Sequence, residues 1–144
     1  MKNKILHILL YILLSNFIYF NGYATDQFNF DVTEVEILNG GNIIKGLKKG
    51  IVKTNDGITI TADIFVYDKL SNILTADGNV EIIDPNQDLK IYSDNAVYQK
   101  NDEIITTYLN SKAIYGIGKF IYADTFKVYR NENILNAKGN VDIV

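Results

Sequence analysis

TITADIFVYDKLSNILTADGNVEII, residues 59–83, is the stretch that decides the fold. Period-two alternation broken by Gly, Asn and Asp is typical of half-buried β-strands joined by tight turns. The stretch therefore predicts one strand–turn unit. Its parts are an alternating strand that ends in aromatic residues (59–67), a polar turn (68–72), a returning strand (73–76) and, after a Gly-Asn step, another short strand (80–82).

The unit is repeated. It returns 61 positions later as FIYADTFKVYRNENILNAKGNVDIV, residues 120–144, with twelve of 25 aligned positions identical. A half-period copy, IYSDNAVYQKNDEII at 91–105, echoes residues 60–74. Repeating strand–turn units bury their apolar faces only by stacking on their neighbours. The chain after residue 25 is therefore predicted to be all-β: a sandwich, barrel, jellyroll or solenoid.

The first 24 residues have a different composition. A short basic start precedes a mostly apolar segment at 5–20, and Gly22-Tyr23-Ala24 places small residues at the −3 and −1 positions of a cleavage site. This is the layout of a secretory signal peptide. The alternative is an uncleaved membrane anchor, because the apolar segment is only a little shorter than the roughly 20 residues of a spanning helix. We expect residues 1–24 to be a signal peptide and 25–144 to form one domain.

Export would remove the only histidine, His7, from a chain that has no cysteine. It would leave 12 basic residues against 17 acidic ones, a net charge of −5. A Ser-His-Asp triad, a Cys-His pair and a His-ligated metal need residues that this mature chain lacks. An acidic chain also lacks the basic patch typical of nucleic-acid binding. We therefore expect a non-enzymatic domain without metal, cofactor or nucleic acid.

Two sites built from carboxylates alone stay open at this point: a two-carboxylate glycosidase site and a calcium site. Asp68, Asp77 and Asp84 occur singly in turns, and we interpret them as solvated. Asp63 and Asp124 occupy equivalent places in the two long repeats, each after an alanine. This equivalence favours a shared hydrogen-bonding role at a turn or strand end over catalysis.

The repeated pattern resembles a known family. I-x-A-D-x-x-x-Y, a short spacer and L-x-A-x-G-N-V-x-I behind a signal peptide is similar to the OstA-like (organic-solvent-tolerance) family. The first copy runs from Ile60 to Ile82, and the second from Ile121 to Ile143, with its aromatic one position later at Tyr129. The family includes the lipopolysaccharide-transport proteins LptA and LptC and the N-terminal domain of the outer-membrane assembly protein LptD. Residues 28–50 most resemble the beginning of that LptD N-terminal domain.

The resemblance implies an incomplete β-jellyroll, or β-taco, whose V-shaped sheets of short antiparallel strands are open at both ends. It implies a periplasmic location associated with the cell outer membrane, and no catalytic residue. Lipopolysaccharide acyl chains would occupy the interior. Other Lpt jellyroll domains would stack on the edge strands, forming a bridge to the outer-membrane assembly complex. Both a fragment of a longer LptD and a stand-alone LptA-like protein fit this resemblance.

Inward aliphatic and aromatic residues, supplied in phase by the repeat, would line the groove. Each buried methylene contributes about 0.8 kcal/mol, so an apolar trough is sufficient to hold acyl chains. The lining residues that we expect are Ile58, Ile60, Ala62, Leu74, Val80, Ile82, Ile121, Phe126, Val128, Leu135, Val141 and Ile143. The alternative is that these residues pack against one another as a closed core.

Other functions stay open beside lipid transport. A periplasmic or surface β-solenoid, acting as a structural or adhesin module, would have a closed core and bind no lipid. A carbohydrate-active β enzyme would need paired acidic residues such as Asp63 and Asp124 in a cleft. Lys45, Lys48 and Lys49 lie among glycines, and we interpret them as a solvated basic turn in preference to a lipid-phosphate site.

Overall fold

The computed structural model describes residues 27–144, so the expected signal peptide lies outside the described residues. In this range the chain forms twelve antiparallel strands and two short 3-10 turns, η1 (Asn39–Gly41) and η2 (Arg130–Glu132). The strands are β1 (Phe28–Leu38), β2 (Ile43–Thr54), β3 (Thr59–Ala62), β4 (Ile64–Asp68), β5 (Ile73–Asp84), β6 (Leu89–Gln99), β7 (Ile104–Tyr108), β8 (Ser111–Tyr115), β9 (Lys119–Ala123), β10 (Thr125–Tyr129), β11 (Ile134–Lys138) and β12 (Asp142–Ile143). No helix among residues 27–144 has the length and apolar character needed to span a bilayer.

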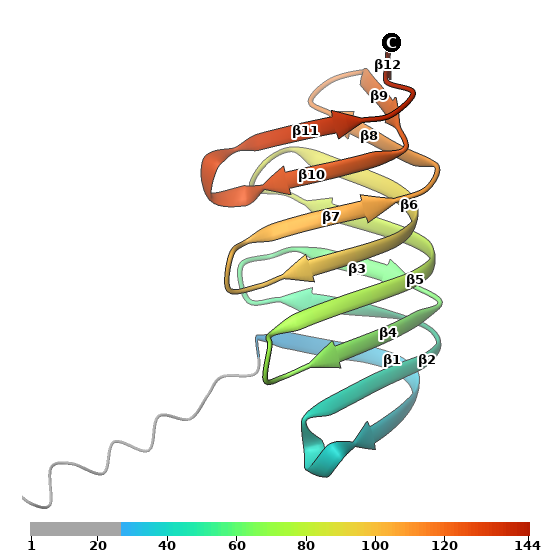
Figure 1. Cartoon of the computed structure of the whole chain (residues 1–144), viewed down its shortest axis with the longest axis vertical. Coiled ribbons are helices and arrows are strands. Elements are labelled where there is room, and N and C mark those ends of the chain that lie inside the picture. The colour runs from blue at the N-terminus through green and yellow to red at the C-terminus, as the bar shows by residue number, and fades with distance from the viewer. Residues whose placement is uncertain (1–26) are drawn as a thin grey trace, which may run out of the picture.

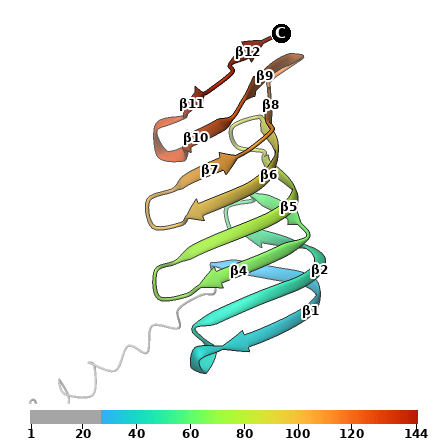
Figure 2. The same cartoon turned by 45° about the vertical axis from the view of Figure 1, so that its right-hand side comes forward.

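The strands build two facing arms. The four long strands β1, β2, β5 and β6 bend in the middle and give one half to each arm. The short strands belong to one arm each: β4, β7, β10 and β11 to arm 1, and β3, β8, β9 and β12 to arm 2. The arms are joined along the line of bends, which we call the corner, and their hairpin turns lie at the opposite, free side (Figure 1; Figure 2). The result is a V whose axis runs from β1 to β12.

The corner is built from paired residues in the left-handed backbone region. Glycine adopts this conformation freely, and asparagine tolerates it better than most residues. The pairs are Lys48-Lys49, Gly78-Asn79, Leu109-Asn110 and Gly139-Asn140, with φ between 47° and 78°. The Gly-Asn steps of the repeat therefore turn the chain from one arm into the other.

One element differs from the sequence prediction. Residues 73–76 and 80–82 were expected to form separate strands, whereas β5 continues from Ile73 to Asp84 with only a register shift between Asp77 and Val80. The bend consumes two residues, and pairing with β6 resumes on its far side. In the second repeat the same Gly-Asn step does separate β11 from β12.

The core lies between the arms. Phe28 on the arm 2 half of β1 packs against two arm 1 residues, with ring centroids 4.8 Å from Tyr67 and 5.7 Å from Tyr98. Alanines near the corner, such as Ala62 and Ala76, are buried where the two arms converge. The predicted all-β domain of repeated antiparallel strands is confirmed.

Candidate functional site

The twelve residues predicted to line a groove differ in exposure. Eight of them are buried: Ile58, Ile60, Ala62, Leu74, Val80, Ile82, Phe126 and Val128. Ile121 and Leu135 are partly buried at the margin of the core, and Val141 and Ile143 are exposed. Most of these side chains are therefore packed against one another, and the exposed ones lie toward the C-terminal end of the stack.

The two repeats show this difference at equivalent positions. Val80 and Ile82 in the first repeat are each 2% exposed, whereas their counterparts Val141 and Ile143 are 48% and 70% exposed. The first pair is covered by the facing arm, while β12 pairs only with β9 at the end of the sheet. The same apolar sequence is thus buried in the middle of the stack, on β5, and exposed at the C-terminal end.

The N-terminal end holds an aromatic-lined cavity of about 340 Å³. Its walls include Phe28, Phe30, Ile44 and Tyr67, with Asn55 contributing a polar wall. Phe30 also packs edge-on to Phe65, with ring centroids 6.4 Å apart. Rings from both arms therefore line this end, where Val35 and Ile37 of β1 are also exposed.

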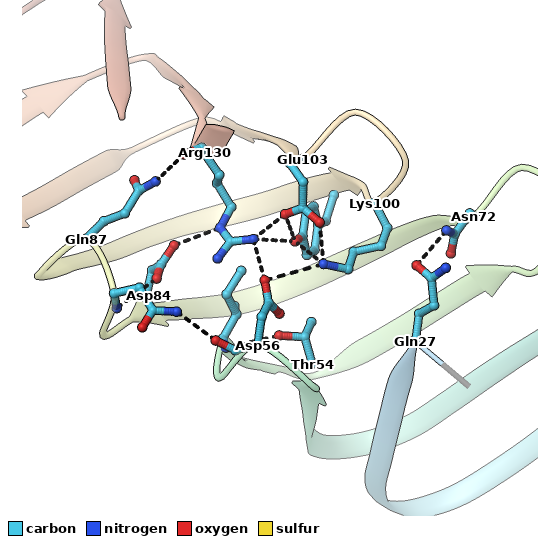
Figure 3. A network of polar contacts seen from close by, with 12 residues as sticks. Gln27, Thr54, Asp56, Asn72, Asp84, Gln87, Lys100, Glu103 and Arg130 are labelled. Carbon is cyan, nitrogen blue, oxygen red and sulfur yellow. Dashed lines mark hydrogen bonds and ion pairs between the residues drawn. The ribbon is translucent and has the colours of Figure 1, made fainter. Parts of the chain in front are cut away.

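A charged network crosses the free side of the V (Figure 3). We call this network, formed by Asp56, Asp84, Lys100, Glu103 and Arg130, the clasp. Asp56 and Asp84 lie at turns of arm 2, and the other three lie at turns of arm 1. The clasp therefore connects turns of arm 2 with turns of arm 1 through side chains.

Arg130 is the centre of the clasp. Its Nε donates to Asp84 Oδ2 at 2.8 Å, and its Nη1 donates to Asp56 Oδ2 at 2.7 Å. The same guanidinium forms an ion pair with Glu103 within arm 1. The side chains of Arg130 and Asp84 are only 8% and 2% exposed, so this cross-arm pair is largely shielded from water. Charge-assisted hydrogen bonds of this kind are stronger than neutral ones.

Lys100 makes the second connection between the arms. Its Nζ lies 3.4 Å from Asp56 Oδ2 and also pairs with Glu103. The buried hydroxyl of Tyr98 accepts hydrogen bonds from Lys100 Nζ at 3.1 Å and Arg130 Nη1 at 2.9 Å, and donates to Glu103 Oε2 at 2.6 Å. The hydroxyl of the buried Tyr98 thus connects the clasp to the core.

The clasp changes the acidity of its members. Burial by itself would raise the pKa of Asp56, but hydrogen bonds from Thr54 and Arg130 and the charges of Arg130 and Lys100 outweigh it and bring the pKa to about 2. Glu103 follows the same pattern: burial opposes ionisation, yet Lys100 and Tyr98 lower its pKa. Burial and the bond to Glu103 raise the pKa of Tyr98, which keeps this phenol protonated. All clasp carboxylates that show a shift therefore favour the charged form.

Neutral hydrogen bonds extend the closure along the free side. Gln87 Nε2 of arm 2 donates to the Arg130 carbonyl at 2.8 Å. Near the N-terminal end, Asn72 Nδ2 donates to Gln27 Oε1 at 2.8 Å, and Asn72 also accepts from the Tyr67 hydroxyl. The opening between the arms is thus closed by side chains from Gln27 to Arg130.

The clasp was not predicted from the sequence, and one of its residues, Asp84, was misinterpreted. Asp84 was interpreted as a solvated turn carboxylate, which is wrong, because it is buried and paired with Arg130. Asp77 is exposed as expected, and Asp68 is only partly buried. The cause of the error is that Arg130 comes from a distant turn that only the V-shaped fold brings close.

The repeated aspartates lie at the corner, away from the interior. Asp63 Oδ2 accepts from Asn79 Nδ2 at 2.6 Å, and Asp124 Oδ1 and Oδ2 each accept from Asn140 Nδ2 at 3.0 Å. The predicted hydrogen-bonding role at a turn is confirmed. A third pair, Asp94 with Asn110 at 2.7 Å, was not singled out from the sequence, although Asp94 occupies the matching place in the half-period copy.

This placement counts against catalysis by Asp63 and Asp124. Four strand spacings separate the two corner positions, which corresponds to about 19 Å. Glycosidase carboxylates lie roughly 5 to 9.5 Å apart. Among the described residues no group of three or more His, Cys, Asp or Glu side chains has an arrangement that could hold a metal ion.

Lys48 and Lys49 at the corner are solvated, whereas Lys45, also predicted to belong to a basic turn, is paired within β2 and partly buried. Lys48 pairs with Glu34 at 2.6 Å on the surface, and Lys45 lies 4.0 Å from Glu36. Lys48 and Lys49 are exposed, in agreement with the interpretation as a solvated basic turn.

Comparison with known proteins supports the fold. No family model matches the sequence, and no curated protein matches it. The structure is similar to the crystal structure of LptH, described as the LptA-homologous periplasmic component of the conserved lipopolysaccharide transport device from Pseudomonas aeruginosa. The match has a TM-score of 0.70 at 16% sequence identity and covers 81% of this chain and 93% of that chain. The predicted LptA-like β-jellyroll fold is confirmed.

Proposed function

We propose that this chain is a periplasmic, non-enzymatic domain that holds the acyl chains of lipopolysaccharide between its two arms during transport toward the outer membrane. The proposal is supported by the apolar inner face of a jellyroll that is similar to the LptH fold, buried in the middle of the stack and exposed at its C-terminal end. Transfer of a lipid chain requires only burial of methylene groups, which an apolar face provides. No reacting group is needed.

We place the first contact with lipid at the C-terminal end of the stack. Leu135, Val141 and Ile143 already present apolar side chains to solvent or to the margin of the core. The twelve predicted lining residues together would form the full acyl site, and those further inside would become available only when the arms move apart. Residues 1–24 would direct export, and 25–144 would be the working domain.

Stacking with other Lpt jellyrolls is a second part of the proposal. β1 has only β2 as a neighbour, and β11 has only β10, so both ends of the sheet carry unpaired strand edges. Exposed edges with apolar side chains such as Ile37 and Ile134 favour pairing with another strand. We propose that these ends bind neighbouring jellyrolls in a bridge to the outer-membrane assembly complex, and that the chain is closest to the N-terminal domain of LptD.

The lipid site is tested by photocrosslinking in cells, with a photoreactive residue at Leu135 and, separately, at Asn136. Leu135 pairs with buried Val128 and faces inward, whereas Asn136 pairs with Lys127 and faces outward. A lipopolysaccharide adduct at Leu135 and none at Asn136 is the expected result. Equal adducts at both positions, or none in a folded and exported protein, would reject the acyl site.

A second candidate function is favoured by one observation. Eight of the twelve predicted lining residues are packed as a closed core. Such packing would equally suit a structural or adhesin β-module that binds no lipid. Absence of any adduct in the crosslinking experiment would favour this function.

A further inference from the structure

We infer that the clasp is a releasable lock on the side of the V, and that it opens stepwise from the C-terminal end to admit an acyl-bearing lipid. This inference rests on the proposed lipid-binding function. It concerns how the packed part of the interior becomes accessible, and through which side of the molecule.

The fold permits only one simple opening motion. The arms are continuous through β1, β2, β5 and β6 at the corner, where backbone hydrogen bonds such as Asp63 N to Gly78 O at 2.9 Å also join them. At the free side the hairpin turns of the two arms are held together by contacts in which at least one partner is a side chain. Separating the arms must therefore hinge at the corner and break the clasp.

The chemistry of the clasp suits repeated opening. Separated Arg130, Asp84 and Asp56 side chains regain hydration, which offsets much of the lost attraction. An apolar seal would instead expose hydrocarbon to water with no such return. A closure made of ion pairs can therefore hold the arms together and still release them at moderate cost.

The order of the contacts gives the opening a direction. Arg130, in η2 toward the C-terminal end of the stack, holds Asp84 and Asp56. Lys100 comes next along arm 1 with its bond to Asp56, and Asn72 with its bond to Gln27 comes last. A lipid that enters beside the exposed Val141 and Ile143 meets the Arg130 contacts first, so these contacts control access to the remaining interior.

The lock is tested first without lipid. The chain contains no cysteine, so Asn55→Cys on an arm 2 turn and Glu132→Cys on an arm 1 turn provide a unique pair for spin labels. The distance distribution between the labels reports on the opening. We expect a narrow distribution in the otherwise unchanged protein, and a population at longer distances when Arg130→Gln is added. Lys127→Gln on the adjacent strand β10 is the control and should leave the distribution narrow. A folded Arg130→Gln protein with an unchanged distribution would overturn the inference.

A second measurement does not depend on the stability of a clasp variant. The same cysteine pair is joined with a cleavable bis-maleimide linker, and uptake of fluorescently labelled lipopolysaccharide is followed by stopped flow. We expect the linked protein to take up lipid at least about tenfold more slowly, with recovery after cleavage; tenfold corresponds to about 1.4 kcal/mol. Equal uptake before and after cleavage would overturn the lock. No uptake in any form would reject the proposed lipid binding, while the spin-label distances would still decide whether the clasp holds the arms.

Discussion

Arg130 Nε lies 2.8 Å from Asp84 Oδ2, although the two residues are 46 positions apart in the sequence. Asp84 ends β5 on arm 2, and Arg130 begins the turn between β10 and β11 on arm 1. Both side chains are almost excluded from solvent. This pair is therefore the most shielded of the ion pairs that join the two arms at the free side.

Arg130→Gln should lower the free energy of unfolding by about 3 kcal/mol, because it leaves the buried Asp84 carboxylate without its partner. Lys127→Gln, which removes a cation that alternates with the buried residues of β10, should change it by less than about 0.5 kcal/mol. Urea denaturation followed by far-UV circular dichroism measures both. Similar losses for the two variants would show that Arg130 adds little to the closure.

The clasp should also make stability depend on pH in the acid range. The folded-state pKa of Asp56 is depressed to about 2 from its ordinary 3.8, and the pKa of Glu103 is lowered as well. Depressed carboxylates stabilise the fold above their unfolded pKa, and this contribution is lost as pH falls through the folded value. Stability should therefore decline from about pH 4 toward pH 2, as measured by thermal melting at a series of pH values. Asp56→Asn should flatten part of this decline, and an unchanged slope in that variant would contradict the assignment.

Gly78→Ala should destabilise the corner more than Gly118→Ala does. Both glycines have positive φ, 78° and 76°, so each alanine meets the same backbone penalty of roughly 1–2 kcal/mol. A Cβ at Gly78 would in addition lie 2.6 Å from Asp63 Oδ2, whereas a Cβ at Gly118 would meet nothing within 4 Å. The difference between the two melting curves isolates the contact with Asp63. Equal losses would mean that Asp63 shifts freely and that the corner is not tightly packed there.

Asp63→Ala, Asp94→Ala and Asp124→Ala should each cost about 1 kcal/mol, because each removes one acceptor from an Asp–Asn pair at the corner. The changes at Asp63 and Asp124 should add, since the two positions do not touch. Asp77→Ala, at an exposed carboxylate on the same sheet, is the control. Hydrolytic activity present in the unsubstituted protein and lost in the Asp63/Asp124 double variant would contradict the purely structural role.

The strand–turn unit could be predicted because it is written in local sequence. Alternation from Thr59 to Ala62, the Gly-Asn steps and the repeated Asp63 and Asp124 each act within a few residues or on the next strand. Ile60 and Ile82, which the repeat predicts to share one face, are buried neighbours across β3 and β5. The continuity of β5 was not predicted. This strand crosses the bend because its partner β6 continues on the far side.

The clasp could not be predicted, because its members have no local partner. Asp84 precedes Pro85 and Asn86, a context that resembles any solvated turn. Arg130 replaces the Lys69 of the first repeat without any change in spacing. Only the stacking of units and the closure of the V bring these turns together. The exposure of apolar residues at the C-terminal end also depends on position in the stack. Val80 and Val141 occupy equivalent positions of the repeat, yet Val80 is buried and Val141 is exposed.

Titration calorimetry with intact and chemically deacylated lipopolysaccharide decides whether the interior binds acyl chains. We predict saturable binding of the intact lipid with a negative heat-capacity change, which marks burial of apolar surface, and no binding of the deacylated saccharide. Equal binding of both forms, or binding of neither by the folded protein, would contradict it.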